Sequence, residues 1–571
     1  MSSEQIIQTD VLVIGGGIAG CFAAINAKSY GLDVLLVDKA CAGKSGASSA
    51  ADRAFMVSNP EWGIDLDKCL EEFNVRCEYI NNRDWDEIVL NESVSIYQDL
   101  RSWGVKFARD ALSYINEWPP FGNLRIIHRE IPMVLRNQAE KTGVKVVDRI
   151  MVVELIKRSD DVVGALGFSL DDGSLYVLLA KATILAGGGS SFKPPGYGMA
   201  MLTGDAEAMA YRAGAEITGK EFSDSHYTWA QYPAWDVHRA ADAAFPYFVD
   251  SEGNRVGIGS LLGWETNLSM EFTIHMGKGP IFWNLDAATD EDVLRMKQRQ
   301  ADVHNPIQYE RIGYDLNQRG KILCVGGANA GYSAPHTAGI WIIDNVCSTN
   351  LQGLYAAGDC AGTRINGSYY PNPGLGTCPA AVTGRRAGKG AADYILQQYK
   401  QKKLPSMKLN EFEKFKNLIY APLHRSGGYN PRWIIQLVQN TMMPYFILFI
   451  KNEERLKSAL TTIEFIRDHF IPRLRAEDIH ELRLAHEVRN MVLIAEMILK
   501  FSLFRTESRG LHYREDYPKR DDPNWLAWIK AREENGEMKL LKEPVPRKWW
   551  PDLSTPYKNR YPLRFPGELV K

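Results

Sequence analysis

The chain of 571 residues lacks the cysteine patterns of a metal or haem protein. Its eight cysteines are scattered, and none forms a C-x-x-C pair or a C-x-x-C-H motif. This spacing excludes the usual iron–sulfur, zinc and c-type haem sites within the chain itself. Scattered, unpaired cysteines fit a reducing compartment, so we expect a cytoplasmic protein with no metal site of its own.

Long hydrophobic runs and a strong charge of either sign are also missing. A membrane-spanning helix needs about 20 apolar residues, whereas the apolar run Tyr445–Ile450 is short and followed by KNEERLK. The opening MSSEQIIQTD has neither the basic nor the apolar region of a signal peptide. The net charge of −2 gives no basis for binding nucleic acid or an anionic membrane surface. We therefore expect neither nucleic acid nor a direct membrane span.

The first informative motif is DVLVIGGGIAG, which starts at Asp10 and ends at Gly20. An apolar strand runs into glycines, an Ala-rich helix follows, and a second strand, DVLLVD, ends in Asp38. The glycines permit a tight turn and let backbone N–H groups approach a pyrophosphate at the helix N-terminus. An acid at the end of the second strand can accept hydrogen bonds from ribose hydroxyls. The combination predicts a dinucleotide-binding domain.

Two later segments favour FAD over NAD. KATILAGGGSSF (181–192) is a third apolar strand that ends in glycines, and GLYAAGDCAG (353–362) places Asp359 where it could hold a ribityl chain or pyrophosphate. Each segment alone fits an ordinary strand-end turn, but their order is typical of flavoproteins, and an NAD dehydrogenase does not need the second one. The Gly/Pro-rich loop after Asp359 then suits a close backbone approach to a flat ring.

A family resemblance follows from two further segments. YGMAMLTGDAEAMAYRAGAEITGKEFSDSHYT (197–228) and RTESRGLHYREDYPKRDDPNWL (505–526) resemble signatures of the fumarate reductase and succinate dehydrogenase flavoproteins. The resemblance implies an α/β fold: an FAD-binding Rossmann-like domain of glutathione-reductase type, an α+β capping domain and a C-terminal helical domain. The expected boundaries are 1–230 and 346–404 for the FAD-binding domain, 231–345 for the capping domain, 405–520 for the helical domain and 521–571 for an aromatic, Pro-rich tail.

The departures from this family concern the flavin attachment and the substrate. Gly46, in SGASSAA, stands where members with covalent FAD carry a histidine, which predicts non-covalent FAD. No arginine of YYPNPGLGTC (369–378) aligns with the family's dicarboxylate-binding arginine, and the capping region lacks its proton-donating Arg-Asp pair. Because each lost Arg–carboxylate pair removes a strong charge-assisted bond, fumarate and succinate are not the expected substrates.

The adenylylsulfate reductase α-subunit branch resembles this chain more closely. That branch is similar at SGASSAA, at IIHREI (126–131) and at AGIWI (338–342), although its histidine before the last motif falls on Ala334, with His336 two residues later. The resemblance implies a small anionic substrate and an iron–sulfur, ferredoxin-like partner subunit, and it leaves a heterodimer or a higher oligomer open.

Two sets of site residues are predicted. The FAD contacts are Gly15, Gly17, Ile18, Ala19, Gly20, Asp38, Lys39, Ser45, Gly46, Ala47, Ser48, Val147, Ala186, Gly187, Gly188, Asp205, Gly358, Asp359, Gly374, Leu375, Gly376 and Thr377. The catalytic candidates are His226, Glu130, His336, Arg364 and Arg239, with His226 first because it matches the family histidine. Each has a plainer alternative: a histidine is more often a structural hydrogen-bonding residue, the arginines suit the surface, and Glu130 suits a helix N-terminus.

The C-terminal tail and the overall activity each have more than one interpretation. Trp525, Trp528, Trp549 and Trp550 predict an extended aromatic arm that is buried either on this chain or, as the favoured interpretation, on the partner. The leading functional prediction is an FAD-dependent flavoprotein subunit that exchanges electrons between an anionic substrate and an iron–sulfur partner. The alternatives are a stand-alone reductase or dehydrogenase of an activated C–C bond, and a catalytically silent electron-transfer subunit.

Overall fold

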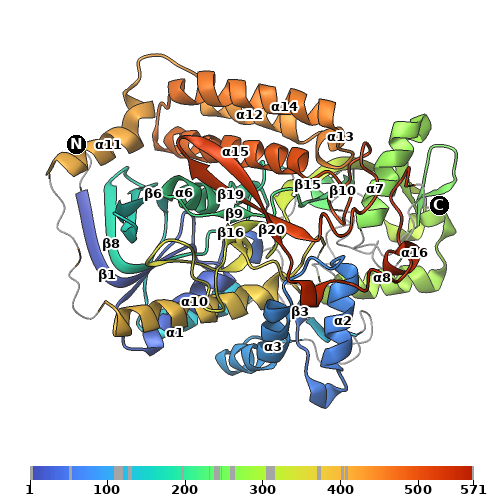
Figure 1. Cartoon of the computed structure of the whole chain (residues 1–571), viewed down its shortest axis with the longest axis horizontal. Helices are drawn as coiled ribbons and strands as arrows, with labels where there is room; N and C mark the ends of the chain where they lie inside the picture. The colour runs from blue at the N-terminus through green and yellow to red at the C-terminus, as the bar shows by residue number, and fades with distance from the viewer. Residues whose placement is uncertain are drawn as a thin grey trace.

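A largely parallel sheet forms the core of the N-terminal half (Figure 1). In the computed structural model its strand order is β5-β2-β1-β8-β7-β6, with β17 also paired to β8. The structure describes residues 4–49, 54–107, 120–125, 131–194, 199–229, 232–236, 245, 247–256, 264–303, 315–369, 374–399, 404 and 409–568. The strands are β1 (Glu4–Ile14), β2 (Val34–Val37), β5 (Lys145–Val147), β6 (Ile150–Arg158), β7 (Asp161–Ser169), β8 (Leu175–Leu185) and β17 (Leu354–Ala356).

The parallel pairing brings the predicted cofactor segments to one edge of the sheet. Ile14 is in register with Val37 on one side and with Leu185 on the other, and Leu185 is also in register with Ala356. The loops that follow these four residues therefore lie next to one another at the carboxyl ends of the strands, where open α/β sheets bind their ligands. This arrangement confirms the FAD-binding fold that the sequence predicts.

Two helices of the FAD-binding domain pack closely against each other. They are α1 (Ile18–Ser29) and α10 (Thr377–Gln397), which lie side by side in Figure 1. A Cβ on Gly384 would stand 2.2 Å from the carbonyl oxygen of Ala19, and one on Gly388 would stand 2.4 Å from that of Ala23. The spacing of four residues puts both glycines on one helix face. They are therefore required for α10 to approach the helix of the first glycine motif.

A second, antiparallel sheet forms the capping region. Its order is β11-β10-β15-β14-β12-β13. The strands are β10 (Ser223–Trp229), β11 (Tyr232–Asp236), β12 (Phe248–Val249), β13 (Arg255–Val256), β14 (Ile281–Asn284) and β15 (Lys321–Ser333), accompanied by helices α7 (Trp264–Thr273) and α8 (Asp290–Val303). Most of these elements fall within the predicted cap, 231–345, and the sheet begins slightly earlier with β10.

A group of C-terminal helices lies at the top of Figure 1, on the side of the molecule opposite α1 and α10. They are α11 (Leu409–His424), α12 (Pro431–Met442), α13 (Tyr445–Leu448), α14 (Glu453–Phe465) and α15 (Ile479–Phe504). Helix α15 is buried along most of its length because it packs both on α12 and α14 and on α6 (Asp205–Ala213) of the FAD-binding domain. Within the described residues, no helix is both long enough and apolar enough to cross a membrane.

The C-terminal tail does not form an extended arm. Its hairpin, β19 (Ala527–Glu534) and β20 (Glu537–Pro544), joins the sheet of order β18-β16-β9-β19-β20, where Ala531 is in register with Ile217. The other strands of that sheet are β9 (Ile217–Thr218), β16 (Gly339–Trp341) and β18 (Ala361–Gly362).

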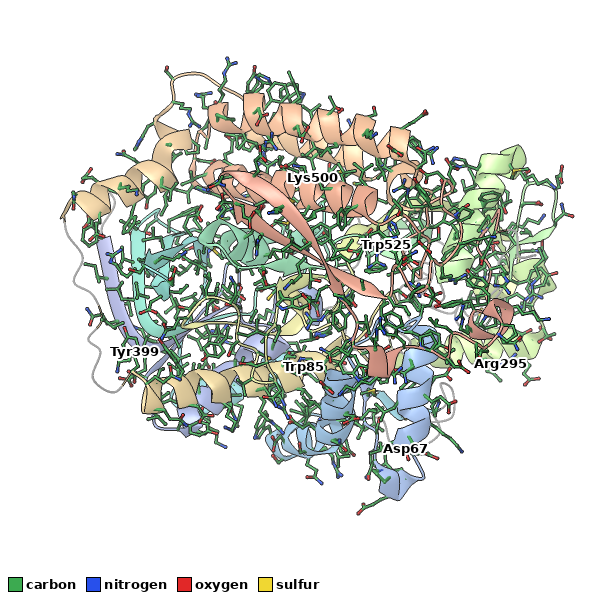
Figure 2. The ribbon with its side chains drawn as sticks, viewed as in Figure 1. Asp67, Trp85, Arg295, Tyr399, Lys500 and Trp525 are labelled. Carbon is green, nitrogen blue, oxygen red and sulfur yellow. The ribbon has the colours of Figure 1, made fainter. Side chains whose placement is uncertain are left out.

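Three of the four tail tryptophans are accordingly buried on this chain, and Trp550 is partly buried. Trp525, Trp528 and Trp549 are only 4%, 9% and 7% exposed. Trp525, labelled in Figure 2, lies among the surrounding side chains rather than at the outline of the molecule. The favoured interpretation of these residues as a partner surface is therefore wrong. The physical reason is that β9 offers an open strand edge to a hairpin that follows it by some 300 residues, which a sequence pattern does not reveal.

Candidate functional site

The first glycine loop forms a cradle in which side chains do not fit. Gly15 has a φ of +108°, and a Cβ there would stand 2.3 Å from the carbonyl oxygen of Ala186. A Cβ on Gly20 would stand 1.8 Å from the carbonyl oxygen of Gly15. Gly17 directly precedes α1, so the positive end of the helix faces the loop. Backbone N–H groups at such a helix start suit a pyrophosphate, and these residues thus fit the dinucleotide that the sequence predicts.

Asp38 is fixed at the end of β2 and points back to this loop. Its Oδ2 accepts a hydrogen bond from the Gly16 N–H at 2.8 Å, and its Oδ1 accepts from the Ala40 N–H at 2.7 Å and the Ser45 hydroxyl at 3.0 Å. The Asp38 N–H donates to the carbonyl oxygen of Val147 on β5 at 3.0 Å. The predicted contacts Asp38, Ser45 and Val147 are therefore adjacent, and the carboxylate is held beside the glycine loop as a ribose acceptor requires.

The segment from Ser45 to Ser48 covers the start of α1. The Ser48 hydroxyl accepts a hydrogen bond from the Ile18 N–H at 3.2 Å, which brings the segment against the predicted pyrophosphate position. Gly46 has a φ of +73°, and a Cβ there would meet nothing within 4 Å. Gly46, the position from which the sequence predicts non-covalent FAD, thus has open space around it but no side chain.

Lys39 and Asp205 are close to the cradle but engaged with each other. Lys39 Nζ lies 2.7 Å from Asp205 Oδ2 and 2.8 Å from Glu487 Oε1, and the Asn490 amide donates to Asp205 Oδ1 at 2.8 Å. Burial by itself would raise the pKa of Glu487. The positive charges of Lys39, Lys193 and Arg483 outweigh this effect and hold that pKa well below its usual range. Both side chains thus tie the cradle to α15, and their role as cofactor contacts stays a prediction.

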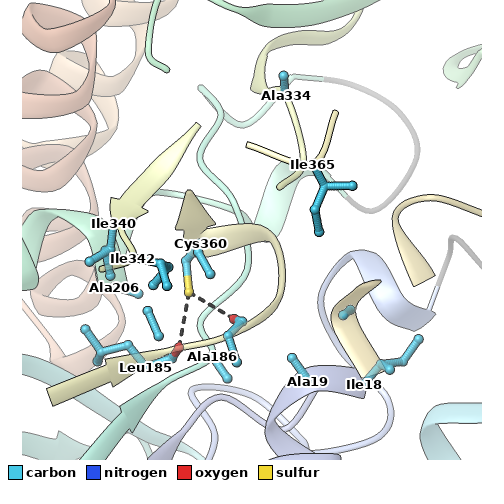
Figure 3. Packing of buried hydrophobic residues seen from close by; sticks show 14 of the residues in the cluster. Ile18, Ala19, Leu185, Ala186, Ala206, Ala334, Ile340, Ile342, Cys360 and Ile365 are labelled. Carbon is cyan, nitrogen blue, oxygen red and sulfur yellow. Dashed lines mark hydrogen bonds between the residues drawn. The ribbon is translucent and has the colours of Figure 1, made fainter. Parts of the chain in front are cut away.

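The segment GLYAAGDCAG (353–362) completes the site. Its strand β17 pairs with β8, which pairs with β1 along its other edge. Gly358 has a φ of +72°, and the Asp359 carboxylate accepts a hydrogen bond from the Tyr332 hydroxyl at 2.8 Å. Cys360, which follows, donates from Sγ to the carbonyl oxygen of Leu185 at 3.3 Å (Figure 3), and burial raises its pKa to about 12, so it is a neutral packing residue. Asp359 thus lies at the end of β15 as well as beside β8. Sequence reasoning missed Tyr332.

His336 is the one catalytic candidate that the described structure places beside the flavin segments. It is fully buried, with a φ of +58°. Its Nε2 lies 3.1 Å from the carbonyl oxygen of Gly376 and 3.6 Å from Asp359 Oδ1. Since a carbonyl only accepts, Nε2 carries the hydrogen and Nδ1 is the free acceptor. Burial lowers the pKa of His336 against the opposing effect of Asp359, so the ring is neutral at pH 7.

Gly374 to Thr377 form the turn into α10 next to His336. Gly374 has a φ of +94°, Leu375 is fully buried, and Thr377 begins the helix. The Asn366 amide donates to the carbonyl oxygen of Pro335 at 2.7 Å and to that of Leu375 at 3.5 Å, which joins this turn to the His336 segment. The FAD contacts predicted in this turn therefore lie with His336 and Asp359 in one cluster.

Arg364 does not face this cluster, which corrects the prediction of a substrate-binding arginine. Its guanidinium lies 3.7 Å from the ring centroid of Trp341 and 4.9 Å from that of Trp528. Trp528 lies on β19, so the side chain of Arg364 contacts the tail hairpin. No local pattern indicates this position because Trp528 is more than 160 residues away in the chain.

The remaining catalytic candidates are less defined. His226 lies on β10, where its backbone is in register with Ala328 of β15. The side chain of His226, and the whole of Glu130 and Arg239, fall outside the described part of the structure. Their assignment to the substrate stays a prediction.

The C-terminal signature (505–526) is largely buried next to the site, although its many charged residues suggest a solvent-exposed segment. Arg505, Arg509 and Arg514 are at most 1% exposed. The Leu511 N–H donates to the carbonyl oxygen of Ser368 at 3.1 Å, next to Asn366. The mixture of charged residues with Gly and Tyr in ESRGLHYRED was the available signal that this segment is buried.

Lys451 belongs to the same buried cluster. Its Nζ lies 2.8 Å from the carbonyl oxygen of Glu221 and 3.2 Å from His512 Nδ1. Burial lowers the pKa of Lys451 to about 7. No pattern in the sequence singled out this lysine.

Known proteins share both the sequence and the fold. A family model described as "FAD binding domain" matches residues 10–376, and one described as "Fumarate reductase flavoprotein C-term" matches residues 436–561. The chain is 26% identical to a fumarate reductase (CoM/CoB) subunit of Methanothermobacter marburgensis, over 92% of this chain and 97% of that protein. It is also 26% identical to a fumarate reductase flavoprotein subunit of Mycobacterium tuberculosis, over 95% and 98% of the two chains.

Two solved structures have the same fold at lower identity. Adenylylsulfate reductase of Archaeoglobus fulgidus superposes with a TM-score of 0.77 at 22% identity, covering 96% of this chain and 97% of that one. The E. coli quinol fumarate reductase flavoprotein superposes with a TM-score of 0.81 at 18% identity, covering 95% and 97%. Together with the glycine cradle, these matches confirm FAD as the cofactor. The chain belongs to the FAD-binding domain family, within the fumarate reductase and succinate dehydrogenase flavoprotein superfamily, and is an FAD-dependent oxidoreductase.

Proposed function

We propose that this chain is the flavoprotein (α) subunit of an adenylylsulfate-reductase-like complex. In it, electrons pass between a small anionic substrate at the flavin and an iron–sulfur partner subunit. The observation that carries the proposal is the orientation of Arg364: the arginine of the loop after Asp359 packs on Trp341 and Trp528, so it does not replace the dicarboxylate-binding arginine of fumarate reductases. The likeness to the Archaeoglobus fulgidus enzyme over 96% of this chain supports the same branch.

The residues have distinct tasks in this proposal. FAD, when bound, supplies the two-electron chemistry. The start of α1 binds the pyrophosphate, Asp38 the ribose and Asp359 the ribityl hydroxyls, while the turn Gly374–Thr377 orients the pyrimidine end. His336 fixes that turn through its hydrogen bond to Gly376. His226 is assigned to the substrate on the strength of its match to the family histidine.

A partner is proposed because the chain has no cysteine motif for a cluster. Electrons that arrive at a flavin beneath a capping domain need an acceptor outside this chain. The M. tuberculosis and M. marburgensis relatives are themselves named as subunits, which agrees with an enzyme of several chains.

Anaerobic titration of the purified, FAD-loaded chain tests the substrate. Sulfite and AMP together form adenylylsulfate and release two electrons, so we expect AMP-dependent reduction of two ferricyanide ions for each sulfite consumed. Sulfite without AMP is the control, because direct addition of sulfite to a flavin also bleaches its colour. Ferricyanide reduction that does not depend on AMP, or that occurs with succinate instead, would contradict the proposed substrate.

A second candidate function is reduction of an activated C–C bond, as in the fumarate reductases at 26% identity. This activity requires positively charged side chains that bind the carboxylates of the substrate, and these come from residues outside the described part of the structure or from a partner. Fumarate-dependent oxidation of a reduced viologen dye separates this candidate from the first.

The attachment of FAD gives a further prediction. Because Gly46 offers no side-chain nitrogen, we expect acid denaturation to release all the flavin into the supernatant. The measurement is flavin absorbance in the supernatant and in the washed pellet, with a covalent flavoprotein treated in parallel as the control. Yellow colour that stays in the pellet would show a covalent bond elsewhere in the chain.

A further inference from the structure

Tyr332 joins the end of a capping strand to the FAD-binding domain. It is 7% exposed and stands next to Ser333, the last residue of β15. The Ser333 N–H donates to the carbonyl oxygen of Ser190 at 2.9 Å, and the Ser190 N–H donates to the Ser333 hydroxyl at 2.9 Å. Ser190 belongs to the glycine-rich segment that follows β8. These two bonds fix the backbone beside Tyr332 against a loop of the predicted flavin site.

The ring of Tyr332 packs against a glycine of that segment. A Cβ on Gly189 would stand 3.1 Å from Cε2 of Tyr332 and 3.7 Å from Cβ of Asp359. The tyrosine and the aspartate therefore meet at the same residue. Since 3.1 Å is too short for an ordinary Cβ contact, any side chain at position 189 would press on the ring. The lack of a side chain at Gly189 is thus what lets Tyr332 lie beside Asp359.

The carboxylate of Asp359 is held at one oxygen and open at the other. The Tyr332 hydroxyl donates to Oδ2 at 2.8 Å. Oδ1 accepts no hydrogen bond from the residues that the structure describes: His336 Nε2 stands 3.6 Å away, and its hydrogen is directed to the Gly376 carbonyl. The side chain of Asp359 is 14% exposed, so a donor can reach it. Because a carboxylate accepts several hydrogen bonds, Oδ1 suits a ligand that carries hydroxyl groups.

Asp359 also lies next to the glycine cradle. A Cβ on the preceding Gly358 would stand 2.8 Å from the Cβ of Ala19, in the first turn of α1. Ala356, three residues before Asp359, is in register with Leu185 at the end of β8. The open oxygen thus lies near the helix start that suits the pyrophosphate. This position fits FAD, whose ribityl chain carries hydroxyl groups next to the pyrophosphate.

We propose that Tyr332 is a positioning residue for FAD. Its hydroxyl holds one oxygen of Asp359, so that the other oxygen accepts a hydrogen bond from the ribityl chain. A carboxylate fixed in this way is already in its binding geometry before FAD arrives. Because Tyr332 lies on β15, tight binding of FAD then depends on contact between the capping sheet and the FAD-binding domain. The inference rests on the proposed role of Asp359 and is independent of the substrate.

A double-mutant cycle on the FAD-loaded chain tests this role. Stepwise dilution of the loaded protein, followed by the fluorescence of the released FAD, gives the dissociation constant. We expect Tyr332→Phe, which keeps the ring and loses the hydroxyl, to raise this constant about tenfold. In an Asp359→Ala background we expect the same change to alter it by less than about twofold, because the group through which Tyr332 acts is gone.

Tyr420→Phe is the matched control. Tyr420 is 6% exposed, and its hydroxyl donates to the carbonyl oxygen of Gly173 at 2.8 Å, in the turn before β8. The variant therefore loses a buried hydrogen bond of the same length at the opposite end of β8. We expect its dissociation constant for FAD to stay within about twofold of that of the unaltered protein. A rise as large as in Tyr332→Phe would show a general effect of lost stability and overturn the proposal.

Two further results would overturn it, and they differ in what they leave standing. If Asp359→Ala weakens FAD binding but Tyr332→Phe does not, or does so equally in both backgrounds, Asp359 keeps its proposed role and Tyr332 only packs. If Asp359→Ala binds FAD as the unaltered protein does, the proposed role of Asp359 is itself wrong. Should Tyr332→Phe not fold, Gly189→Ala decides in the same two backgrounds, because it keeps the hydroxyl but displaces the ring.

Discussion

Deletion of residues 545–571 is expected to prevent the protein from folding into a soluble, FAD-loaded chain. Trp549, Tyr561 and Phe565 of this segment are 7%, 1% and 3% exposed. Burial of each ring contributes about 1.5–3 kcal/mol, so their loss is comparable to the roughly 5–15 kcal/mol that stabilises a typical domain. The deletion also removes Glu568, which lies 3.1 Å from the buried Arg520, and leaves that charge partly uncompensated.

The measurements are the soluble yield, the flavin content and the thermal unfolding midpoint of the truncated and the full chain. Leu553→Ser is the matched control, because Leu553 lies in the deleted segment but is 40% exposed, so we expect its stability to change by at most about 0.5 kcal/mol. A truncated protein that keeps its midpoint and its flavin would restore the idea of an independent arm.

Fumarate reduction is expected to be about a hundredfold to ten-thousandfold slower than in an ordinary fumarate reductase. The two family arginines that bind the dicarboxylate have no aligned counterpart here, and Arg364 is engaged with Trp341 and Trp528. A charged hydrogen-bonded pair contributes about 1.5–3 kcal/mol, so the loss of two such pairs costs about 3–6 kcal/mol, which corresponds to a factor of roughly 10² to 10⁴ in rate.

The assay is anaerobic oxidation of reduced methyl viologen by fumarate, with the FAD content measured in the same sample. A ferricyanide assay on reduced enzyme is the control that electrons enter and leave the flavin. A turnover number of about 1–1000 per second with fumarate, the range of ordinary enzymes, would contradict this prediction and favour the C–C bond reductase.

The cofactor half of the site could be predicted because it depends on short segments at strand ends. Gly15, Gly20 and Asp38 have their roles through local turns, and parallel pairing brings the separate loops together in any sheet of this type. Lys39 and Asp205 follow the same motifs, but their contacts with Glu487 and Asn490 of the distant α15 are not visible in those motifs. Local patterns identify the strand and the turn, whereas the partners of a side chain depend on which distant segment of the chain packs against it.

The substrate half could be predicted only in part. His336 lies near the predicted flavin segments, and its catalytic role stays a prediction. Its partners Gly376 and Asp359, and the neighbouring Tyr332, come together only when β15, the loop after β17 and the start of α10 meet. The same holds for Lys451, whose burial beside His512 lowers its pKa. Burial and charge environment depend on contacts between segments far apart in the chain, so a linear pattern does not report them.

The amino-acid sequence by itself determined the flavin-binding sheet, the FAD cofactor and the superfamily, because glycine positions, apolar strands and a terminal acid restrict the local backbone strongly. The tertiary structure alone decided the fate of the aromatic tail and of Arg364. Both depend on one event, the pairing of β19 with β9, which buries Trp528 against the flavin domain and turns Arg364 from a substrate candidate into an enclosed charge. Strand pairing over such a separation is set by the edge that the folded core leaves open, and that edge exists only in three dimensions.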